Sequence, residues 1–234
     1  MAANVYIMSD LHGEYEKFLQ MLDKIQFQDD DTLFILGDIV DRGPQPIPLL
    51  LDLSMRSNVF CLLGNHEYMA LHTLQALDVE ITEENWDTQL TPELMRGYLE
   101  WMQNGGAVTL QQYRALPPEE REGVLDFLED LALYEFVTVS GQHFVLVHAG
   151  FLHFSPDRPL DDYAAEELIF DRTGYEQSYF SNAITVTGHI PTLSFTDKPQ
   201  IHRKDNRINI DCGACYPGGQ LSCLCLNTME EFYC

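Results

Sequence analysis

Side chains of the kinds that bind metal ions follow five short apolar runs in this 234-residue sequence. Each run has the length of a strand, and a polar group comes directly after it. The residues in these positions are Asp10, His12, Asp38, Asn65, His148 and His189. They offer carboxylate, amide and imidazole groups but no sulfur, a combination that suits manganese, iron, zinc or cobalt better than calcium. The sequence therefore predicts a metal site built from several loops.

The stretch Gly37-Asp38-Ile39-Val40-Asp41-Arg42-Gly43 concentrates charge at the end of one apolar run. Because a carboxylate has two oxygens, Asp38 could bridge two ions about 3.5–4 Å apart. Two divalent ions outweigh the charges of Asp10, Asp38 and a bridging hydroxide, so the centre would still attract a phosphate. Metals lower the pKa of bound water toward ~7. We therefore expect a metal-bridging hydroxide that attacks phosphorus directly.

His66 directly follows an expected ligand but is not needed as one. With Asp41 to orient its ring, His66 could act as a general acid that protonates the leaving oxygen. Arg42 offers a planar fork of N–H donors that matches the oxygens of a phosphate group. These three residues indicate phosphate ester chemistry rather than metal storage.

The elements that must position these residues alternate between strand and helix, which is typical of an α/β fold. Ligands of such folds bind beyond the carboxyl ends of the strands. We expect three strand–loop–helix units within the first 77 residues and further strands after residue 135. The predicted strands are Val5–Met8, Thr32–Leu36, Val59–Leu63, Phe136–Val139, His143–Val147 and Ala183–Thr187, and the early helices are Glu14–Ile25, Pro48–Arg56 and Tyr68–Leu77. Three late segments, Gln200–His202, Arg207–Asp211 and Leu221–Asn227, are expected to close a second sheet as antiparallel strands.

Residues 78–133 interrupt this pattern. Helical stretches are expected at Pro92–Met102 and Glu119–Leu131, on either side of the Asn104-Gly105-Gly106 turn. We expect a mostly helical insertion that borders the cleft and shapes substrate access. The whole chain, residues 1–234, is predicted to form a single catalytic domain.

Composition narrows the class of partner. The sequence holds 13 Lys and Arg against 37 Asp and Glu, a formal charge of −24. This charge argues against a nucleic-acid partner or an anionic membrane, since both require basic patches. The sequence has neither a membrane-length apolar run nor the features of a signal peptide, so a cytoplasmic location is expected. Attraction to a phosphate substrate must then be local.

Four cysteines have spacings that could indicate zinc or a redox pair. Cys212 and Cys215 form a CxxC pattern, and Cys223 and Cys225 a CxC pattern. Period-2 alternation places Cys223 and Cys225 on one face of a strand, where free cysteine behaves as a small apolar residue. No matching His or Cys pair accompanies the four, so we favour core filling over a metal or redox role.

Five motifs in order carry a family resemblance. Asp10-Leu11-His12-Gly13, the Gly37–Gly43 stretch, Gly64-Asn65-His66-Glu67, His148-Ala149-Gly150 and Gly188-His189-Ile190-Pro191-Thr192 together cover most of the chain. They resemble the motifs of the phosphoprotein phosphatase branch of the calcineurin-like metallophosphoesterases. Trp101, Asn104-Gly105-Gly106 and Thr109-Leu110 resemble the compact bacterial and phage-type members. In that family the fold is a β-sandwich flanked by helices, with a dinuclear metal site at one edge.

The resemblance implies a role for each site residue. Asp10, His12 and Asp38 would hold one metal ion, and Asp38, Asn65, His148 and His189 the other. Asp41 and His66 would form the acid pair, and Arg42 would bind phosphate. A second phosphate-binding arginine usually follows an aromatic residue between the last two motifs. Arg172 in Phe170-Asp171-Arg172 matches that position, although Phe170 stands where the family more typically has tryptophan.

The predicted function is metal-dependent phosphomonoester hydrolysis, with a serine/threonine phosphoprotein as the substrate. The metals are two divalent ions, manganese above all in vitro, with iron or zinc as further candidates. An alternative substrate is a dinucleoside polyphosphate such as diadenosine tetraphosphate, or another small phosphate ester. An alternative of another class is a catalytically silent metal-binding interaction module. The intact pair of Asp41 and His66 argues against the last, because a binding module needs neither.

Overall fold

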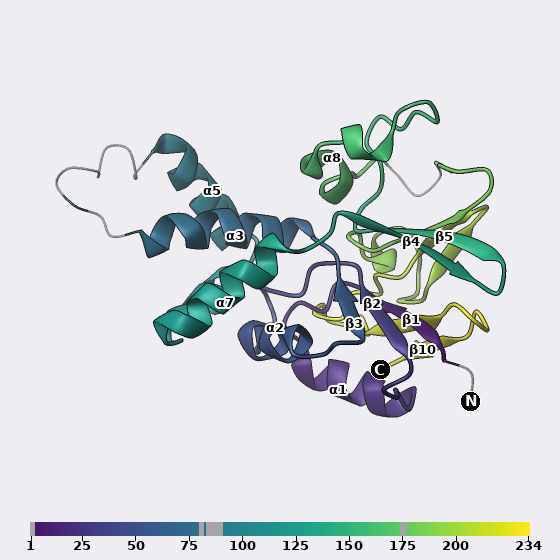
Figure 1. Ribbon diagram of the computed structural model, residues 1–234, viewed down its shortest axis with the longest axis horizontal. Coiled ribbons are helices and arrows are strands. Elements are labelled where there is room, and N and C mark those ends of the chain that lie inside the picture. Colours follow the sequence, from purple (N-terminus) through teal and green to yellow (C-terminus); the bar gives the residue numbers. More distant parts are fainter. Residues whose placement is uncertain (1–2, 80–81, 83–90, 174–176) are drawn as a thin grey trace.

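The computed structural model describes residues 3–79, 82, 91–173 and 177–234. Within these ranges, two five-stranded sheets pack against each other and helices flank them (Figure 1). This arrangement confirms the predicted α/β class and the helix-flanked β-sandwich. The predictions for Met1 and Ala2, and for insertion residues 80–81 and 83–90, lie outside the described residues.

The first sheet carries three of the motif loops. Its strand order is β10-β9-β1-β2-β3, and β1, β2 and β3 run parallel. Residue Val5 pairs with Thr32, and Leu33 pairs with Val59. Parallel strands end at the same edge of a sheet, so this register brings the three following loops together. The strands are β1 (Val5–Met8), β2 (Thr32–Ile35), β3 (Val59–Cys61), β9 (Ser222–Cys225) and β10 (Glu231–Tyr233).

The second sheet has the order β4-β5-β6-β8-β7. Its three central strands, β5, β6 and β8, are parallel, while β4 and β7 pair antiparallel at the two edges. The loops after β5, β6 and β8 therefore also share one edge. The strands are β4 (Tyr134–Val139), β5 (Gln142–Val147), β6 (Ile184–Thr187), β7 (His202–Lys204) and β8 (Arg207–Asn209).

Helices cover the first sheet and extend away from the sandwich. Figure 1 shows α1 and α2 beneath the first sheet, and α3, α5 and α7 projecting together to one side. Helix α3 packs against α5 and α7, and α2 packs against α6. The helices are α1 (Tyr15–Lys24), α2 (Pro46–Ser54), α3 (Asn65–Asp78), α5 (Pro92–Gln103), α6 (Ala107–Arg114), α7 (Pro118–Glu129) and α8 (Ala165–Ile169). Two short 3₁₀ turns lie at Leu160–Asp162 and Thr192–Ser194.

Strand alternation divides the apolar core into layers. On β1, Ile7 points into the layer between the two sheets and Met8 points toward the helices. On β9, Leu224 joins the inter-sheet layer while Cys223 and Cys225 join the helix side. The prediction that these two cysteines fill the core on one strand face is therefore confirmed. A third cluster, which includes Val147 and Phe151, lies where β5 meets α8.

Four predicted elements differ from the structure. The strand expected at Leu221–Asn227 is β9, and it pairs antiparallel with β1 in the first sheet, so its assignment to the second sheet was wrong. The strand β8, which was also expected to be antiparallel, runs parallel to β6. Helix α2 begins at Pro46 rather than Pro48, since proline is well tolerated in the first turn of a helix. Helix α3 begins at Asn65 rather than Tyr68, directly after the extended Gly64.

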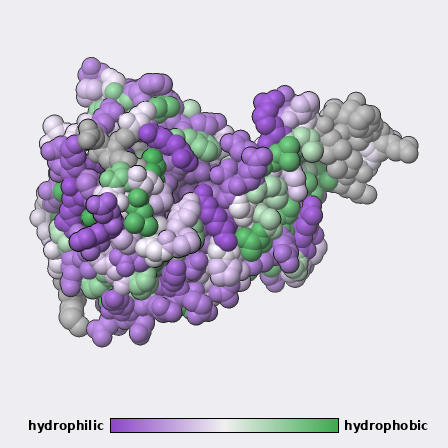
Figure 2. Space-filling view, turned by 180° about the vertical axis from the view of Figure 1, so that it is seen from behind, coloured by the Kyte–Doolittle hydropathy of each residue, from purple (hydrophilic) through white to green (hydrophobic). Residues whose placement is uncertain are grey.

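The surface is mostly polar, as the acidic composition requires. Figure 2 shows a largely hydrophilic face on which apolar residues gather over the projecting helical part. No helix in the described part of the chain has both the length and the apolar character needed to cross a lipid bilayer.

Candidate functional site

The structure gathers the predicted site residues at one edge of the sandwich. Each of these side chains lies in the loop or first helical turn that follows a parallel strand. Asp10 and His12 follow β1, Asp38 follows β2, Asn65 and His66 begin α3 after β3, His148 follows β5, and His189 follows β6. All seven side chains are buried. Two sheets thus supply one site.

Two groups of side chains place metal-binding atoms within 4.8 Å of one another. The first contains His12, Asp38 and His66, and the second contains Asp38, His148 and His189. Asp38 belongs to both groups, as a bridging carboxylate would. The Asn65 Oδ1 atom lies 3.1 Å from His148 Nε2, so the amide also faces the second group.

Asp10 lies beside these groups with its carboxylate turned toward neighbouring polar groups. Its oxygens accept the backbone N–H of His189 at 3.0 and 3.2 Å and the hydroxyl of Ser9. Asp10 is therefore near the site, but it is not one of the residues that the geometry groups around a single point.

Backbone carbonyls fix the orientation of two imidazole rings. His12 Nδ1 is 2.9 Å from the Val40 carbonyl, and His148 Nδ1 is 2.6 Å from the Leu36 carbonyl. A carbonyl can only accept, so Nδ1 of each ring carries the proton and Nε2 keeps its lone pair. This is how metal-binding histidines are held in proteins. Burial, with the nearby charges of His66 and Arg42, lowers the pKa of His12 and keeps that ring neutral.

His189 gives the most direct indication of a ligand. Its side chain is only 7% exposed, yet neither ring nitrogen has a hydrogen-bond partner among the described residues. Buried polar atoms are rarely left without a partner. Burial, then the charges of His148 and Arg172, lowers the pKa of His189 to about 2, so the ring is neutral. These residues therefore fit a centre of divalent metal ions.

The carboxylate of Asp41 is held from three sides. His66 donates its Nδ1–H to Oδ2 at 2.6 Å, and the indole of Trp101 donates to the same oxygen at 2.8 Å. Thr109 donates its hydroxyl to Oδ1 at 2.6 Å. Burial raises the pKa of Asp41 to about 7, and the donors from Thr109 and Trp101 act against this rise. The predicted pairing of Asp41 with His66 is thus present in the structure.

Trp101 and Thr109 show what the helical segment contributes. Trp101 lies on α5 and Thr109 on α6, and the sequence linked both residues to the family without a role. The backbone carbonyl of Gly105, between these helices, accepts the N–H of Arg42 at 3.2 Å. The segment therefore supports the loop that carries Asp41 and Arg42.

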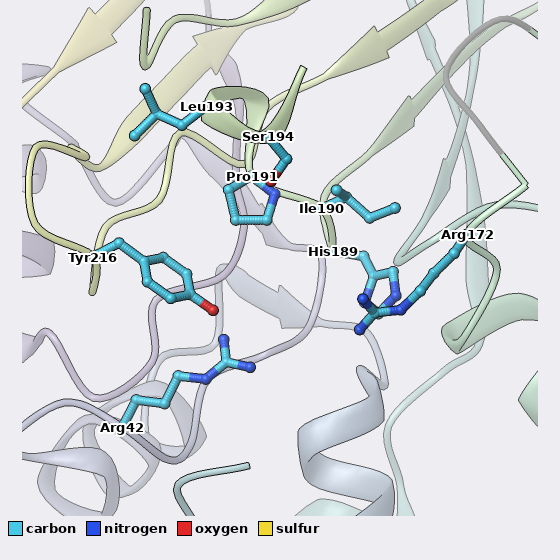
Figure 3. A pocket seen from close by; sticks show the side chains of 8 residues that line it. All are labelled: Arg42, Arg172, His189, Ile190, Pro191, Leu193, Ser194 and Tyr216. Atoms are coloured by element: carbon cyan, nitrogen blue, oxygen red, sulfur yellow. The ribbon is translucent and has the colours of Figure 1, made fainter. Parts of the chain in front are cut away.

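Arg42 and Arg172 line the same cavity of about 400 Å³ together with His189 (Figure 3). The Arg42 guanidinium donates to Nε2 of His66 at 2.8 Å and to Nε2 of His12. The positive charge of Arg172 contributes to the lowered pKa of both His66 and His189. Both arginines thus act electrostatically on the centre from the side open to a ligand.

Two further carboxyl groups support the site. Glu67 accepts four backbone N–H groups, those of Asp38, Ile39, Val40 and Gly64, at 2.7 to 3.1 Å. Asp211, in the loop after β8, is buried and accepts the backbone N–H of Gly213 at 2.8 Å, and burial together with the nearby charge of Asp10 raises its pKa. Its position after a strand, like that of the other site residues, was the signal that could have identified it.

Backbone strain also marks this edge. Six of the ten predicted site residues have positive φ angles: Asp10, His12, Asp38, Asp41, Arg42 and His189. Residues other than glycine rarely adopt this conformation, which costs about 1–3 kcal/mol each and is concentrated at functional sites.

A family model described as calcineurin-like phosphoesterase matches residues 3–210. This chain belongs to the calcineurin-like phosphoesterase family.

Two relatives are named as bis(5'-nucleosyl)-tetraphosphatases. A symmetrical bis(5'-nucleosyl)-tetraphosphatase from Wigglesworthia glossinidia brevipalpis is 39% identical over 87 residues, which cover 36% of this chain and 32% of the relative. An asymmetrical bis(5'-nucleosyl)-tetraphosphatase from Geobacillus sp. (strain WCH70) is 25% identical over 244 aligned positions, 92% of this chain and 87% of the relative. The first match therefore spans about a third of that relative, and the second spans most of its length.

Solved structures share the fold. The crystal structure of a protein named as a diadenosine tetraphosphatase has a TM-score of 0.68 at 19% identity, over 100% of this chain and 94% of the other. A serine/threonine phosphatase from Saccharomyces cerevisiae has a TM-score of 0.51 at 14% identity, over 96% of this chain and 73% of the other. At these identities the similarity concerns the fold and not the substrate.

The packing at Gly64 gives a testable consequence. An alanine methyl at Gly64 would collide with the backbone nitrogen and carboxylate of Asp38. We expect Gly64→Ala to lower the free energy of unfolding by about 1–3 kcal/mol and to weaken manganese binding, because Asp38 must move. Urea denaturation and a manganese titration measure the two effects.

Gly97→Ala is the matched control. Gly97 lies within α5, and no described atom would come within 4 Å of its added methyl. Alanine there should stabilise the helix by about 0.5–1 kcal/mol. Equal stability and manganese affinity of the two variants would contradict the close packing of Gly64 against Asp38.

Proposed function

We propose that this chain hydrolyses dinucleoside polyphosphates, with diadenosine tetraphosphate as the representative substrate. The observation that carries the proposal is the 92% coverage of this chain by a match to an asymmetrical tetraphosphatase. Both matched relatives are named for dinucleotide hydrolysis. They therefore support a dinucleoside polyphosphate, the alternative substrate from the sequence analysis, over a phosphoprotein. The site adds a cavity of about 400 Å³ that is lined by two arginines.

The residues of the site suggest how the metals are held. Asp10, His12 and Asp38 would bind one divalent ion, and Asp38, Asn65, His148 and His189 the other, with manganese as the proposed ion in vitro. Such ions supply Lewis acidity and a water of lowered pKa.

The remaining residues act on the substrate. Arg42 and Arg172 would bind the non-bridging phosphate oxygens from the open side of the cavity, where their planar forks match phosphate geometry. In the structure Nε2 of His66 accepts from Arg42 and carries no proton, so Arg42 would first have to turn to a phosphate group and Nε2 take up a proton from water. His66 would then pass that proton to the leaving phosphate oxygen. Asp41 accepts the Nδ1–H of His66 and thereby keeps Nε2 directed at the cavity.

The first test compares substrates on manganese-loaded protein. We expect the highest kcat/KM for diadenosine tetraphosphate, ahead of a phosphothreonine peptide and p-nitrophenyl phosphate. Chromatography of the nucleotide products and release of free phosphate measure the rates. Preference for the peptide would make the chain a protein phosphatase, and no turnover with two metals bound would make it a silent metal-binding module.

The second test concerns His66. We expect His66→Asn to keep the manganese content of the wild type and to lower kcat by ~10²–10⁴ for an alkyl phosphate, whose leaving group needs a proton. The loss should be smaller for p-nitrophenyl phosphate, whose leaving group is stable as an anion. His72→Asn, an exposed position two turns along α3, is the control. Loss of manganese with His66→Asn would identify His66 as a ligand, which its grouping with His12 and Asp38 also permits.

The third test concerns Arg172. Hydrogen bonds to charged groups contribute about 1.5–3 kcal/mol, so Arg172→Ala should lower kcat/KM about 10- to 100-fold for every phosphate substrate. Arg96→Ala, at an exposed position of α5, removes the same charge away from the cavity. If both variants lose activity equally, Arg172 acts only through the net charge of the protein.

A further inference from the structure

The cavity beside the metal-binding residues has two chemically different walls. Arg42, Arg172 and His189 supply the charged and polar part of its lining, with Arg42 next to Tyr216, and Pro191, Leu193 and Tyr216 supply the apolar part. Figure 3 shows His189 and Arg172 together at one end, with Tyr216, Pro191 and Leu193 toward the other. A simple phosphate group would use only the charged wall, so the apolar wall is available to another part of the substrate.

Tyr216 presents its ring from a loop that is tied down by its own backbone. The N–H of Tyr216 donates to the carbonyl of Gly213 at 2.9 Å, and the N–H of Gly219 donates to the carbonyl of Tyr216 at 3.0 Å. Gly213 has a φ of +77° and Gly218 a φ of +80°, conformations that favour glycine. The backbone that carries the ring is therefore held before a ligand arrives, which lowers the entropic cost of binding.

The floor beneath the ring is narrow and apolar. A methyl group added at Gly213 would lie 3.6 Å from Tyr216 Cδ2 and 3.8 Å from Pro191 Cβ. Tyr216 and Pro191 therefore both lie close to Gly213. The Tyr216 side remains open, since the residue is 41% exposed. Its ring centroid lies 5.4 Å from the Arg42 guanidinium carbon, so the apolar wall directly adjoins the phosphate-binding charge.

We propose that Tyr216, with Pro191 and Leu193, forms the nucleobase subsite of this enzyme. The inference rests on the proposed function and assigns the residue that distinguishes a nucleotide from other phosphate compounds. A purine has a flat π-face that stacks on an aromatic ring irrespective of charge. The position next to Arg42 then puts the base at one end of the cavity and the polyphosphate at the end with Arg172 and His189.

The net charge gives such a subsite a role in affinity. The chain carries a formal charge of −24, so a polyanionic substrate is repelled by the protein as a whole. Arg42 and Arg172 offset this only locally. Stacking on Tyr216 adds an attraction that neither the acidic surface nor salt diminishes.

A second apolar groove is a weaker candidate for the base. It lies between α3 and α5 and is lined by Tyr68, His72 and Phe170, among others. Its described lining residues include Glu100 and no Arg or Lys. The hydroxyl of Tyr68 is also bound to Glu166. An anionic nucleotide would thus meet acidic groups there and no compensating positive charge.

The test measures binding of ADP and of inorganic pyrophosphate, which lacks the base, to manganese-loaded protein by calorimetry. We expect Tyr216→Ala to weaken ADP binding about 10- to 100-fold while pyrophosphate binding changes less than about threefold. Tyr216→Phe and Tyr216→Trp should both retain ADP binding, because either ring can stack. Thermal unfolding of each variant confirms that it is folded.

Three results would overturn the assignment. Equal weakening of ADP and pyrophosphate would mean that Tyr216 acts by positioning Arg42. Unchanged ADP binding in Tyr216→Ala, or a loss of ADP binding in Phe170→Ala instead, would place the base elsewhere. Because binding is measured without turnover, these outcomes are separate from a failure to hydrolyse diadenosine tetraphosphate, which would reject the proposed function itself.

Discussion

The buried carboxylate of Glu67 is the interaction on which the rest of the site depends. It accepts N–H groups from three successive residues after β2 and from Gly64 before α3, so it joins two loops that lie 24 residues or more apart in the chain. Burial raises the pKa of Glu67, and the backbone donors act against that rise by favouring the charged form. The same contacts fix Asp38 relative to Asn65 and His66. A single side chain thereby sets the spacing between the shared carboxylate and the start of α3.

Close approach of backbones makes this arrangement possible and limits what can replace it. A methyl group at Gly37 would fall within 3 Å of both Gly64 and His148, so only glycine lets β2 and β3 bring their loops together. The strain of the site residues with positive φ must be offset by stabilising energy from elsewhere in the structure. That energy comes from the two sheets, whose parallel registers continue into the loops, and from α5 and α6, which hold Asp41 through Trp101 and Thr109. The precision of the site is thus a property of the surrounding framework.

Sequence reasoning succeeded where local pattern determines position. Polar residues that end a buried run must emerge at the carboxyl edge of a parallel sheet, and this placed Asp10, Asp38 and His148 correctly. It failed where partners are distant. Alternation in Leu221–Asn227 reveals which residues share a face but not which strand lies alongside, so β9 was assigned to the wrong sheet. Similarly, no local signal links Trp101 to Asp41 across 60 positions, and Asp211 follows its strand outside the five motifs.

Substrate choice must be decided outside the metal-binding residues. Relatives that share this fold include proteins named for dinucleotide hydrolysis and for protein dephosphorylation, and the same donor set can activate water beside any phosphate group. Discrimination therefore requires contacts with the part of the substrate that does not react. On this chain the available wall is apolar and rigid, it adjoins Arg42, and it belongs to an otherwise strongly acidic protein. An acidic phosphopeptide gains little from such a wall, whereas a nucleobase can stack on it without meeting the repulsive field. The chemistry of the wall and the charge of the protein thus favour the same substrate class as the relatives.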